Sequence, residues 1–224
     1  MQKVVIAGDL HCPFADVNAV SAFYEAIERE EPNIILQAGD SYDMYAHSRF
    51  PRSHDLMTPK QEMAEARQFM EAFWKNCGKI AGRKTRLIQI LGNHCLRPSK
   101  RISESYPEIA SLLGIDHLFK YPGVETILDA RSEFQIDGVI YTHGHYTKHG
   151  QHAAYYGKSV CHGHTHRGNV SYQKLHGRVI WELDVGHLAD ENAEPLQYTP
   201  TKTTKWTVGY GIVDELGPRF IPLI

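Results

Sequence analysis

The sequence lacks the features that mark membrane, secreted and disulfide-linked proteins. No apolar run approaches the ~20 residues that span a bilayer, and the apolar part of residues 1–8 is too short for a signal peptide. The four cysteines have no C-x-x-C spacing, which argues against a zinc ribbon or a disulfide framework. The net charge of −2 gives no general attraction to nucleic acid or membranes. We therefore expect a cytoplasmic protein with reduced thiols, in which any polyanion would have to bind a local basic patch.

Histidine is the residue type that stands out. The chain has 14 histidines, and half of them fall between positions 143 and 166. Histidine is the commonest metal ligand and titrates near neutral pH, so this clustering indicates a metal or acid–base site. A surface patch of neutral imidazoles remains the alternative at this point.

The chain length suits a single domain, 1–224, and the first half predicts alternating strands and helices. Asp16 can cap the first helix, and Thr58 with Gln61 forms a capping box for the second. The first three elements make a βαβ unit with parallel strands and a right-handed crossover. The predicted strands are 3–7, 34–38 and 86–91, and the predicted helices run over 17–30 and from 58 to about 78.

The second half predicts β-hairpins, because short β-branched and aromatic runs flank turn residues such as Asp137-Gly138 and His176-Gly177. Two stretches, 41–57 and 96–121, are expected to be long loops, the second with a short helix at 108–113. The strands expected in this half are 134–136, 139–141, 158–161, 170–175, 179–185, 210–214 and 220–223.

Five short polar motifs follow predicted strands, where sites form in open α/β sheets. Each motif alone is weak, although Gly-His-Thr-His is more specific because alternating residues of a strand point to the same side. Together and in this order they are difficult to explain as turns. The motifs are Gly8-Asp9-Leu10-His11, Gly39-Asp40-Ser41-Tyr42-Asp43, Gly92-Asn93-His94, Thr142-His143-Gly144-His145 and Gly163-His164-Thr165-His166.

This set resembles the calcineurin-like metallophosphoesterases, whose pattern is D-x-H, G-D-x-x-D, G-N-H, H and G-H-x-H, and it looks closest to a compact branch found in bacteria and phages. The resemblance covers the chain from Asp9 to His166. It implies a four-layer αββα sandwich of two mixed β-sheets flanked by helices. It also implies two divalent metal ions, because oxygen and imidazole donors suit Mn first, and also Fe, Zn or Ni.

The resemblance implies a role for each motif residue. One metal would be held by Asp9, His11 and His166, and the other by Asn93, His143 and His164. Asp40 would bridge the two ions, which then sit ~3.5–4 Å apart and activate a water. His94 would be the general acid, oriented by Asp43.

Two positions depart from the family pattern. Members with protein phosphatase activity often carry Arg after the dyad Asp and an acid after Gly-Asn-His, whereas this chain has Met44 and Cys95. The missing arginine weakens a phosphoprotein phosphatase assignment without affecting the ligands.

Several softer candidates surround the motifs. Arg97 is expected to bind substrate phosphate, since guanidinium suits phosphate bidentately. A solvated surface position is the open alternative for Arg97 and for the other candidates. These further candidates for the cleft are Lys100, Arg101, Arg167, His145 and His149. Cys12, Cys95 and Cys161 adjoin ligand loops as packing residues, and we hypothesise that their oxidation would lower activity.

The sequence thus favours a phosphoester hydrolase whose substrate is a nucleotide, a nucleic acid or a small phosphomonoester, with diesterase and monoesterase activity both open. A non-catalytic scaffold on the same fold is the alternative, although such scaffolds typically lose the acid or several ligands. A histidine-rich metal-buffering protein would lack the interleaved Asp, Asn and Gly. Oligomeric state is left unassigned.

Overall fold

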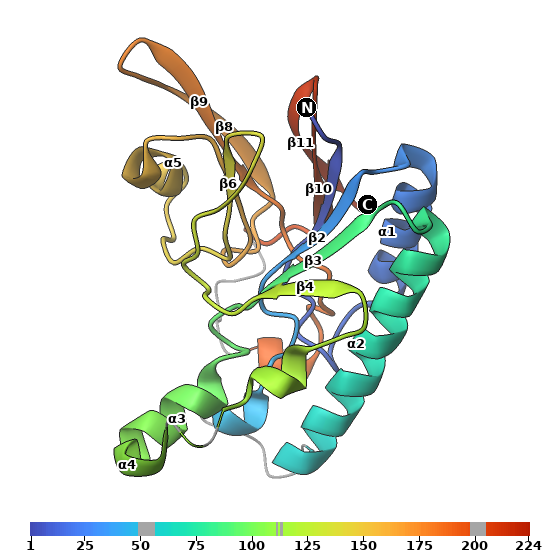
Figure 1. The fold of residues 1–224 in the computed structure, drawn as a ribbon, viewed down its shortest axis with the longest axis vertical. Helices are drawn as coiled ribbons and strands as arrows, with labels where there is room; N and C mark the ends of the chain where they lie inside the picture. Colours follow the sequence, from blue (N-terminus) through green and yellow to red (C-terminus); the bar gives the residue numbers. More distant parts are fainter. Residues whose placement is uncertain (49–56, 111, 113, 198–204) are drawn as a thin grey trace.

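The computed structural model describes residues 1–48, 57–110, 112, 114–197 and 205–224, and contains two β-sheets (Figure 1). The six-stranded sheet has the order β11-β10-β1-β2-β3-β4, in which β1 to β4 are parallel and β10 and β11 antiparallel. The five-stranded sheet has the order β5-β6-β7-β9-β8 and is also mixed. The strands of the first sheet are β1 (Val4–Ala7), β2 (Ile34–Ala38), β3 (Arg86–Ile90), β4 (Val124–Ile127), β10 (Gly209–Asp214) and β11 (Gly217–Pro222). Those of the second are β5 (Phe134–Ile136), β6 (Val139–Tyr141), β7 (Val160–His162), β8 (Asn169–Leu175) and β9 (Arg178–Asp184).

Two long helices cover the outer face of the first sheet, α1 (Val17–Glu30) and α2 (Pro59–Ala81) (Figure 1). Asp16 accepts hydrogen bonds from the backbone N–H groups of Asn18 and Ala19, as an N-cap should. Thr58 and Gln61 form the predicted capping box, and Pro59 occupies the first turn. The sequence therefore predicted the starts of both helices correctly.

The central strands are apolar on both sides because each sheet face is covered. In β1, Val5 packs toward α1 and α2, whereas Val4 and Ile6 pack against the second sheet. A third apolar cluster joins the far side of the second sheet to the short helix α5 (Gln151–Tyr156). The three clusters separate four layers, which confirms the αββα sandwich.

The stretch 96–121 was predicted as a long loop with one short helix at 108–113. A short helix does lie at that position, α4 (Pro107–Ala110), but α3 (Arg97–Ser105) and a 3-10 turn, η2 (Asp116–Phe119), were not predicted. The α3 sequence is polar nearly throughout and lacks the apolar stripe by which an amphipathic helix is recognised. The strand β4 and the helix α5 were also missed, since runs of four and six residues give little periodicity.

The other predicted loop, 41–57, contains a 3-10 turn, η1 (Tyr45–His47), and its residues 49–56 lie outside the described part of the chain. A further 3-10 turn, η3 (Glu194–Leu196), lies between β9 and β10. Within the described residues, no helix is long and apolar enough to cross a membrane.

Candidate active site

The five motif loops meet at one end of the sandwich. The strands β1, β2 and β3 are parallel, so their carboxyl ends deliver Asp9, Asp40 and Asn93 to the same edge. The strands β6 and β7 of the second sheet are also parallel and deliver His143 and His164. This convergence of two sheet edges brings residues more than 150 positions apart into contact.

One cluster is built around Asp9. The Nε2 atom of His166 lies 2.9 Å from Asp9 Oδ2 and 3.1 Å from His11 Nε2. All three side chains are buried. The Nδ1–H of His11 donates to Asp43 Oδ2 at 2.8 Å, which leaves its Nε2 available to a metal ion. This is the first predicted ligand group.

A second cluster is built around Asp40. The Nε2 atom of His143 lies 3.2 Å from Asp40 Oδ2 and 3.0 Å from Asn93 Oδ1. The Nδ1–H of His143 donates to the carbonyl of Ala38 at 3.0 Å, so its Nε2 is again the free donor atom. The ring of His164 packs edge-on against His143, with centroids 5.1 Å apart. All seven predicted ligands are thus gathered in two adjoining groups.

The two groups are linked to each other. The backbone N–H of His164 donates to Asp9 Oδ2 at 2.7 Å, and His143 Nδ1 lies 3.6 Å from Asp9 Oδ1. Asp9, Asp40 and His143 themselves form a set whose donor atoms could hold one ion. The predicted ligand groups therefore adjoin closely enough to share ions.

His94 and Asp43 lie at the border of both clusters. The Nδ1 atom of His94 lies 3.2 Å from Asp43 Oδ2, and its Nε2 lies 3.9 Å from Asp40 Oδ2. The carboxylate of Asp43 therefore orients both His94 and His11. The sequence pattern linked Asp43 to His94 only, and nothing in the spacing of the motifs indicated the contact with His11.

Arg97 is tied to this pair rather than left open to solvent. Its Nη1 donates to the carbonyl and to Oδ1 of Asp43, at 2.9 and 3.2 Å. Its Nη2 donates to His94 Nε2 at 2.9 Å. The guanidinium thus covers the nitrogen that would face a leaving group.

The motif glycines are required by the closeness of these loops. A Cβ at Gly39 would lie 2.1 Å from His143 Nδ1, and one at Gly92 would lie 2.0 Å from Asp40 Oδ1. Such distances exclude any side chain without displacement of a ligand.

The ligand loops also hold non-glycine residues in the left-handed backbone region, which costs of order 1–3 kcal/mol for each residue. These residues are His11, Asp40, His164 and His166, with φ from 45° to 73°. Strain of this kind concentrates at functional loops. It also corrects the sequence argument for Gly-His-Thr-His, because β7 ends at His162 and neither His164 nor His166 lies on the strand.

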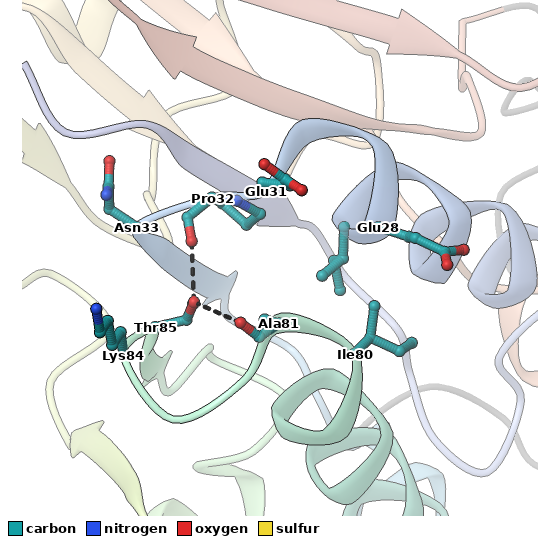
Figure 2. Close-up of a pocket in the computed structure, with 9 residues that line it drawn as sticks. Glu28, Glu31, Pro32, Asn33, Ile80, Ala81, Lys84 and Thr85 are labelled. Atoms are coloured by element: carbon teal, nitrogen blue, oxygen red, sulfur yellow. Dashed lines mark hydrogen bonds between the residues drawn. The ribbon is translucent and has the colours of Figure 1, made fainter.

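A cleft of about 740 Å³ opens over the clusters. Asn93 and His164 line it together with His94 and Arg97, and so do Lys100, Arg101 and Arg167, whereas His145 and His149 lie outside its lining. Another hollow, of about 350 Å³, lies at the opposite ends of the strands between α1 and α2 (Figure 2). There the Thr85 hydroxyl donates to the carbonyls of Pro32 and Ala81. Its described lining contains no histidine.

Comparisons with known proteins agree with this geometry. A family model described as calcineurin-like phosphoesterase matches residues 2–168. The chain belongs to the calcineurin-like phosphoesterase family.

Two curated relatives are the Gene 54 proteins of Mycobacterium phages D29 and L5. Each is 24% identical, over 249 and 246 residues, and each alignment covers 100% of this chain and 94% of the relative. Among solved structures, YfcE, a phosphoesterase from E. coli, is 15% identical with a TM-score of 0.42, over 95% of this chain and 88% of that one. A single mutant of Vps29 from Entamoeba histolytica is 12% identical with a TM-score of 0.45, over 95% and 85%.

The donor set suits the pair of divalent metals that this phosphoesterase family generally binds. Within the described residues, the buried oxygen Asp9 Oδ1 has no hydrogen-bond partner, as expected of an atom that serves as a ligand. The carboxylate and amide oxygens combined with imidazole nitrogens match the preferences of first-row divalent ions. The clusters can therefore hold metal.

The charges in the candidate site favour cation binding. Burial raises the pKa of Asp9, but the neighbouring His166 and His143 outweigh it and bring the pKa down to about 2. The pKa of Asp40 is likewise held well below its usual value, since His143 and His94 outweigh burial. Burial lowers the pKa of His164 to about 3. At neutral pH these groups are thus in the ionised or neutral forms that ligate metals.

The pKa of His143 is shifted upward, because the same carboxylates surround it. Burial lowers its pKa, but Asp40 and Asp9 dominate and raise it to about 9. The two carboxylates thus stabilise a positive charge between them, which is also what a metal ion would provide. Metal and proton are expected to compete for this position.

Sequence reasoning missed a third buried group on the second sheet, formed by His152, His162 and Glu182. The imidazole Nε2 of His152 accepts hydrogen bonds from the backbone N–H groups of His145 and Tyr146, at 3.0 and 3.1 Å. The proton of neutral His152 is therefore on Nδ1, the atom nearer Glu182. A metal at this group would need that same atom deprotonated, so we interpret the group as a hydrogen-bonded array.

The cysteines next to the ligand loops are fully buried. Burial raises the pKa of Cys12, Cys95 and Cys161. A thiol without thiolate character or solvent access reacts slowly with oxidants. The structure thus argues against the predicted oxidative sensitivity and supports the packing role.

Proposed function

We propose that this protein hydrolyses phosphoesters, with Asp9, His11 and His166 holding one divalent ion and Asn93, His143 and His164 another. Asp40 would bridge the two. Ions held in this way would supply an activated water and positive charge for the attacking and leaving oxygens of an in-line displacement. Mn suits the donors best, followed by Fe, Zn or Ni. The observation that carries the proposal is the meeting of both ligand groups beneath one cleft that His94 lines, with Asp43 beside His94.

In this proposal His94 Nε2 takes up a proton from solvent once Arg97 has turned away, and passes that proton to the leaving oxygen. Asp43 accepts from His94 Nδ1–H and so directs Nε2 into the cleft. In the structure Arg97 covers that nitrogen, so the guanidinium has to turn toward the substrate phosphate when it arrives. A bidentate contact with phosphate is stronger than its present contact with a neutral imidazole. Arg97 is thus proposed to bind substrate and to free His94 in the same movement.

The test is hydrolysis of bis-p-nitrophenyl phosphate and p-nitrophenyl phosphate by chelator-stripped protein, with and without Mn²⁺. We expect Mn-dependent turnover that is lost in Asp40→Asn, and the ratio of the two rates would separate diesterase from monoesterase activity. A wild-type protein that remains inactive with every divalent metal would overturn the proposal and favour the non-catalytic scaffold.

A further inference from the structure

The cleft concentrates positive charge in a chain that is slightly acidic overall. The sequence has 24 Lys and Arg against 26 Asp and Glu. The cleft lining nevertheless contains four cationic side chains, whereas Glu104 is its only described carboxylate besides the ligand Asp40. The four cations are Arg97, Lys100, Arg101 and Arg167.

Three of these cations are not used by the hydrolytic centre. Lys100 and Arg101 follow Arg97 by about one turn of α3, ~5.4 Å further from His94. Lys100 forms an exposed ion pair with Glu104, at 3.9 Å. Arg167 donates from Nη1 to the Thr147 carbonyl at 2.8 Å, which leaves other N–H groups of its guanidinium for a ligand.

An aromatic side chain lies on the same cleft. Trp206 packs against His166, with ring centroids 4.3 Å apart, and lines the cleft. Cationic side chains combined with an aromatic surface are the usual elements of single-strand nucleic-acid binding, in which bases stack and phosphates pair with Lys and Arg.

We propose that the substrate is a single-stranded polynucleotide, with the phosphates next to the scissile one held by Lys100, Arg101 and Arg167. This proposal rests on the proposed hydrolytic function. Each phosphate contact made by a single strand contributes ~0.7 to the slope of log affinity against log salt. The binding is therefore salt-dependent, and two of the three contacts that cause this dependence, Lys100 and Arg101, come from α3.

The test compares Lys100→Ala/Arg101→Ala with Arg83→Ala/Lys84→Ala, a matched pair of exposed cations far from the cleft. A labelled oligothymidylate and bis-p-nitrophenyl phosphate are the substrates. We expect the cleft variant to lose at least tenfold in kcat/KM on the oligonucleotide and less than twofold on the small diester. The control pair should match wild type on both.

Binding separates this proposal from the hydrolytic one. Oligonucleotide binding is measured by fluorescence anisotropy on full-length His94→Ala protein, where turnover plays no part. The cleft variant, added to this background, should lower the salt slope by ~1.4, the share of two contacts. An unchanged slope, equal losses on both substrates, or tighter binding of a doubly phosphorylated peptide would overturn the proposal.

The buried hydrogen-bonded array of His152, His162 and Glu182 is connected to one of the ligand loops. The Nδ1–H of His162 donates to the Gly163 carbonyl at 2.7 Å, and its Nε2 lies 3.2 Å from Glu182 Oε1. Glu182 is fixed in turn by the N–H groups of Gly150 and Ala153, both at 2.8 Å. The contact at Gly163 matters because its carbonyl and the N–H of the next residue belong to one planar peptide.

The N–H of this peptide belongs to His164 and donates a hydrogen bond to Asp9 Oδ2. We infer that Glu182 and His162 are positioning residues, which hold the peptide plane and through it the ligand Asp9. Loss of such an outer partner typically weakens metal binding 10–100-fold.

Calorimetric metal titration of Glu182→Gln tests this inference without relying on hydrolysis. We expect one of two binding phases to weaken 10–100-fold while the other stays unchanged. His162→Asn retains an N–H donor, so it should weaken the same binding phase less than Glu182→Gln does. Asp214→Asn removes another buried carboxylate, on β10, and serves as the control for general destabilisation. Equal weakening of both phases, or none, would contradict the inference, whereas absence of both phases in wild type would contradict the proposed function.

Discussion

At the scale of single residues, Asp43 connects parts of the site that the sequence treats separately. It accepts from His11 and His94 through Oδ2 and from Arg97 through Oδ1. Burial raises the pKa of Asp43, but these histidine partners outweigh it and keep the pKa below its usual range. One carboxylate thus supports a metal ligand, the proposed acid and the proposed phosphate-binding group.

The role of His94 predicts a dependence on the leaving group. His94→Ala should lower kcat by ~10²–10⁴-fold for an alkyl phosphate ester, because its alkoxide needs a proton to leave. The loss should be much smaller for p-nitrophenyl phosphate, which leaves as a stable anion. Steady-state kinetics on both esters measures this, with metal content checked to be unchanged. Equal losses on the two esters would argue against acid catalysis by His94.

The shared role of Asp43 predicts a broader defect. Asp43→Asn should lower kcat and also weaken metal binding, since His11 loses its carboxylate partner. Metal titration next to kinetics distinguishes this variant from His94→Ala, which should affect kcat alone. Normal metal affinity in Asp43→Asn would show that the hydrogen bond between Asp43 and His11 does not contribute to metal binding.

At the scale of elements, the sequence correctly predicted where the motif loops follow the strands and where the two long helices begin. The Gly-Asp and Gly-Asn-His motifs follow β1, β2 and β3, and parallel strands necessarily bring their carboxyl ends together. It did not predict α3, which has only two apolar residues, Pro98 and Ile102, although its charged residues recur at helical spacing (97, 100, 101 and 104). The part of the cleft lining that α3 provides was therefore predicted as a loop. Contacts such as Glu182 with the peptide N–H groups of residues 150 and 153 depend on sheet packing, which no local pattern records.

The tight loop packing predicts the effect of Gly92→Ala. A Cβ there would meet Asp40 Oδ1, so we expect loss of metal binding and activity. Gly114→Ala is the matched control, because a Cβ at Gly114 meets no atom within 4 Å. Metal content after dialysis reports the outcome for both. Retention of full metal by Gly92→Ala would contradict the described approach of these loops.

Glu182 on β9 predicts a pH-dependent contribution to stability. Burial raises its pKa, but His152 and His162 outweigh burial and lower it well below 4.5. A carboxyl group whose pKa is lower in the folded state than in the unfolded state stabilises the folded protein at pH values above its unfolded pKa. This stabilisation is lost as the pH falls toward the folded-state pKa. Glu182→Gln should therefore be less stable than wild type from about pH 5 upward, with a difference that shrinks below about pH 4. Urea unfolding at both ends of this range tests it, and a difference constant with pH would contradict it.

At the scale of the whole molecule, the site exists only because two sheets pack face to face. Asp9, His11, Asp40 and Asn93 come from the first sheet, and His143, His164 and His166 from the second. Metal binding should thus stabilise the sandwich as a unit, by about 2.7 kcal/mol when free metal is 100-fold above its Kd. Thermal unfolding with and without chelator measures this, and an unchanged Tm would argue against binding across the sheets.

The most direct test of the proposed dinuclear centre is the number of metal ions bound per chain. Protein loaded with Mn²⁺ and freed of excess metal is analysed by mass spectrometry for metal per chain, with His143→Ala alongside. We expect two ions per wild-type chain and fewer in His143→Ala, since that side chain contacts the carboxylates of both Asp9 and Asp40. A wild-type chain that holds one ion or none, with Mn²⁺ and with each of Fe, Zn and Ni, would contradict the dinuclear centre.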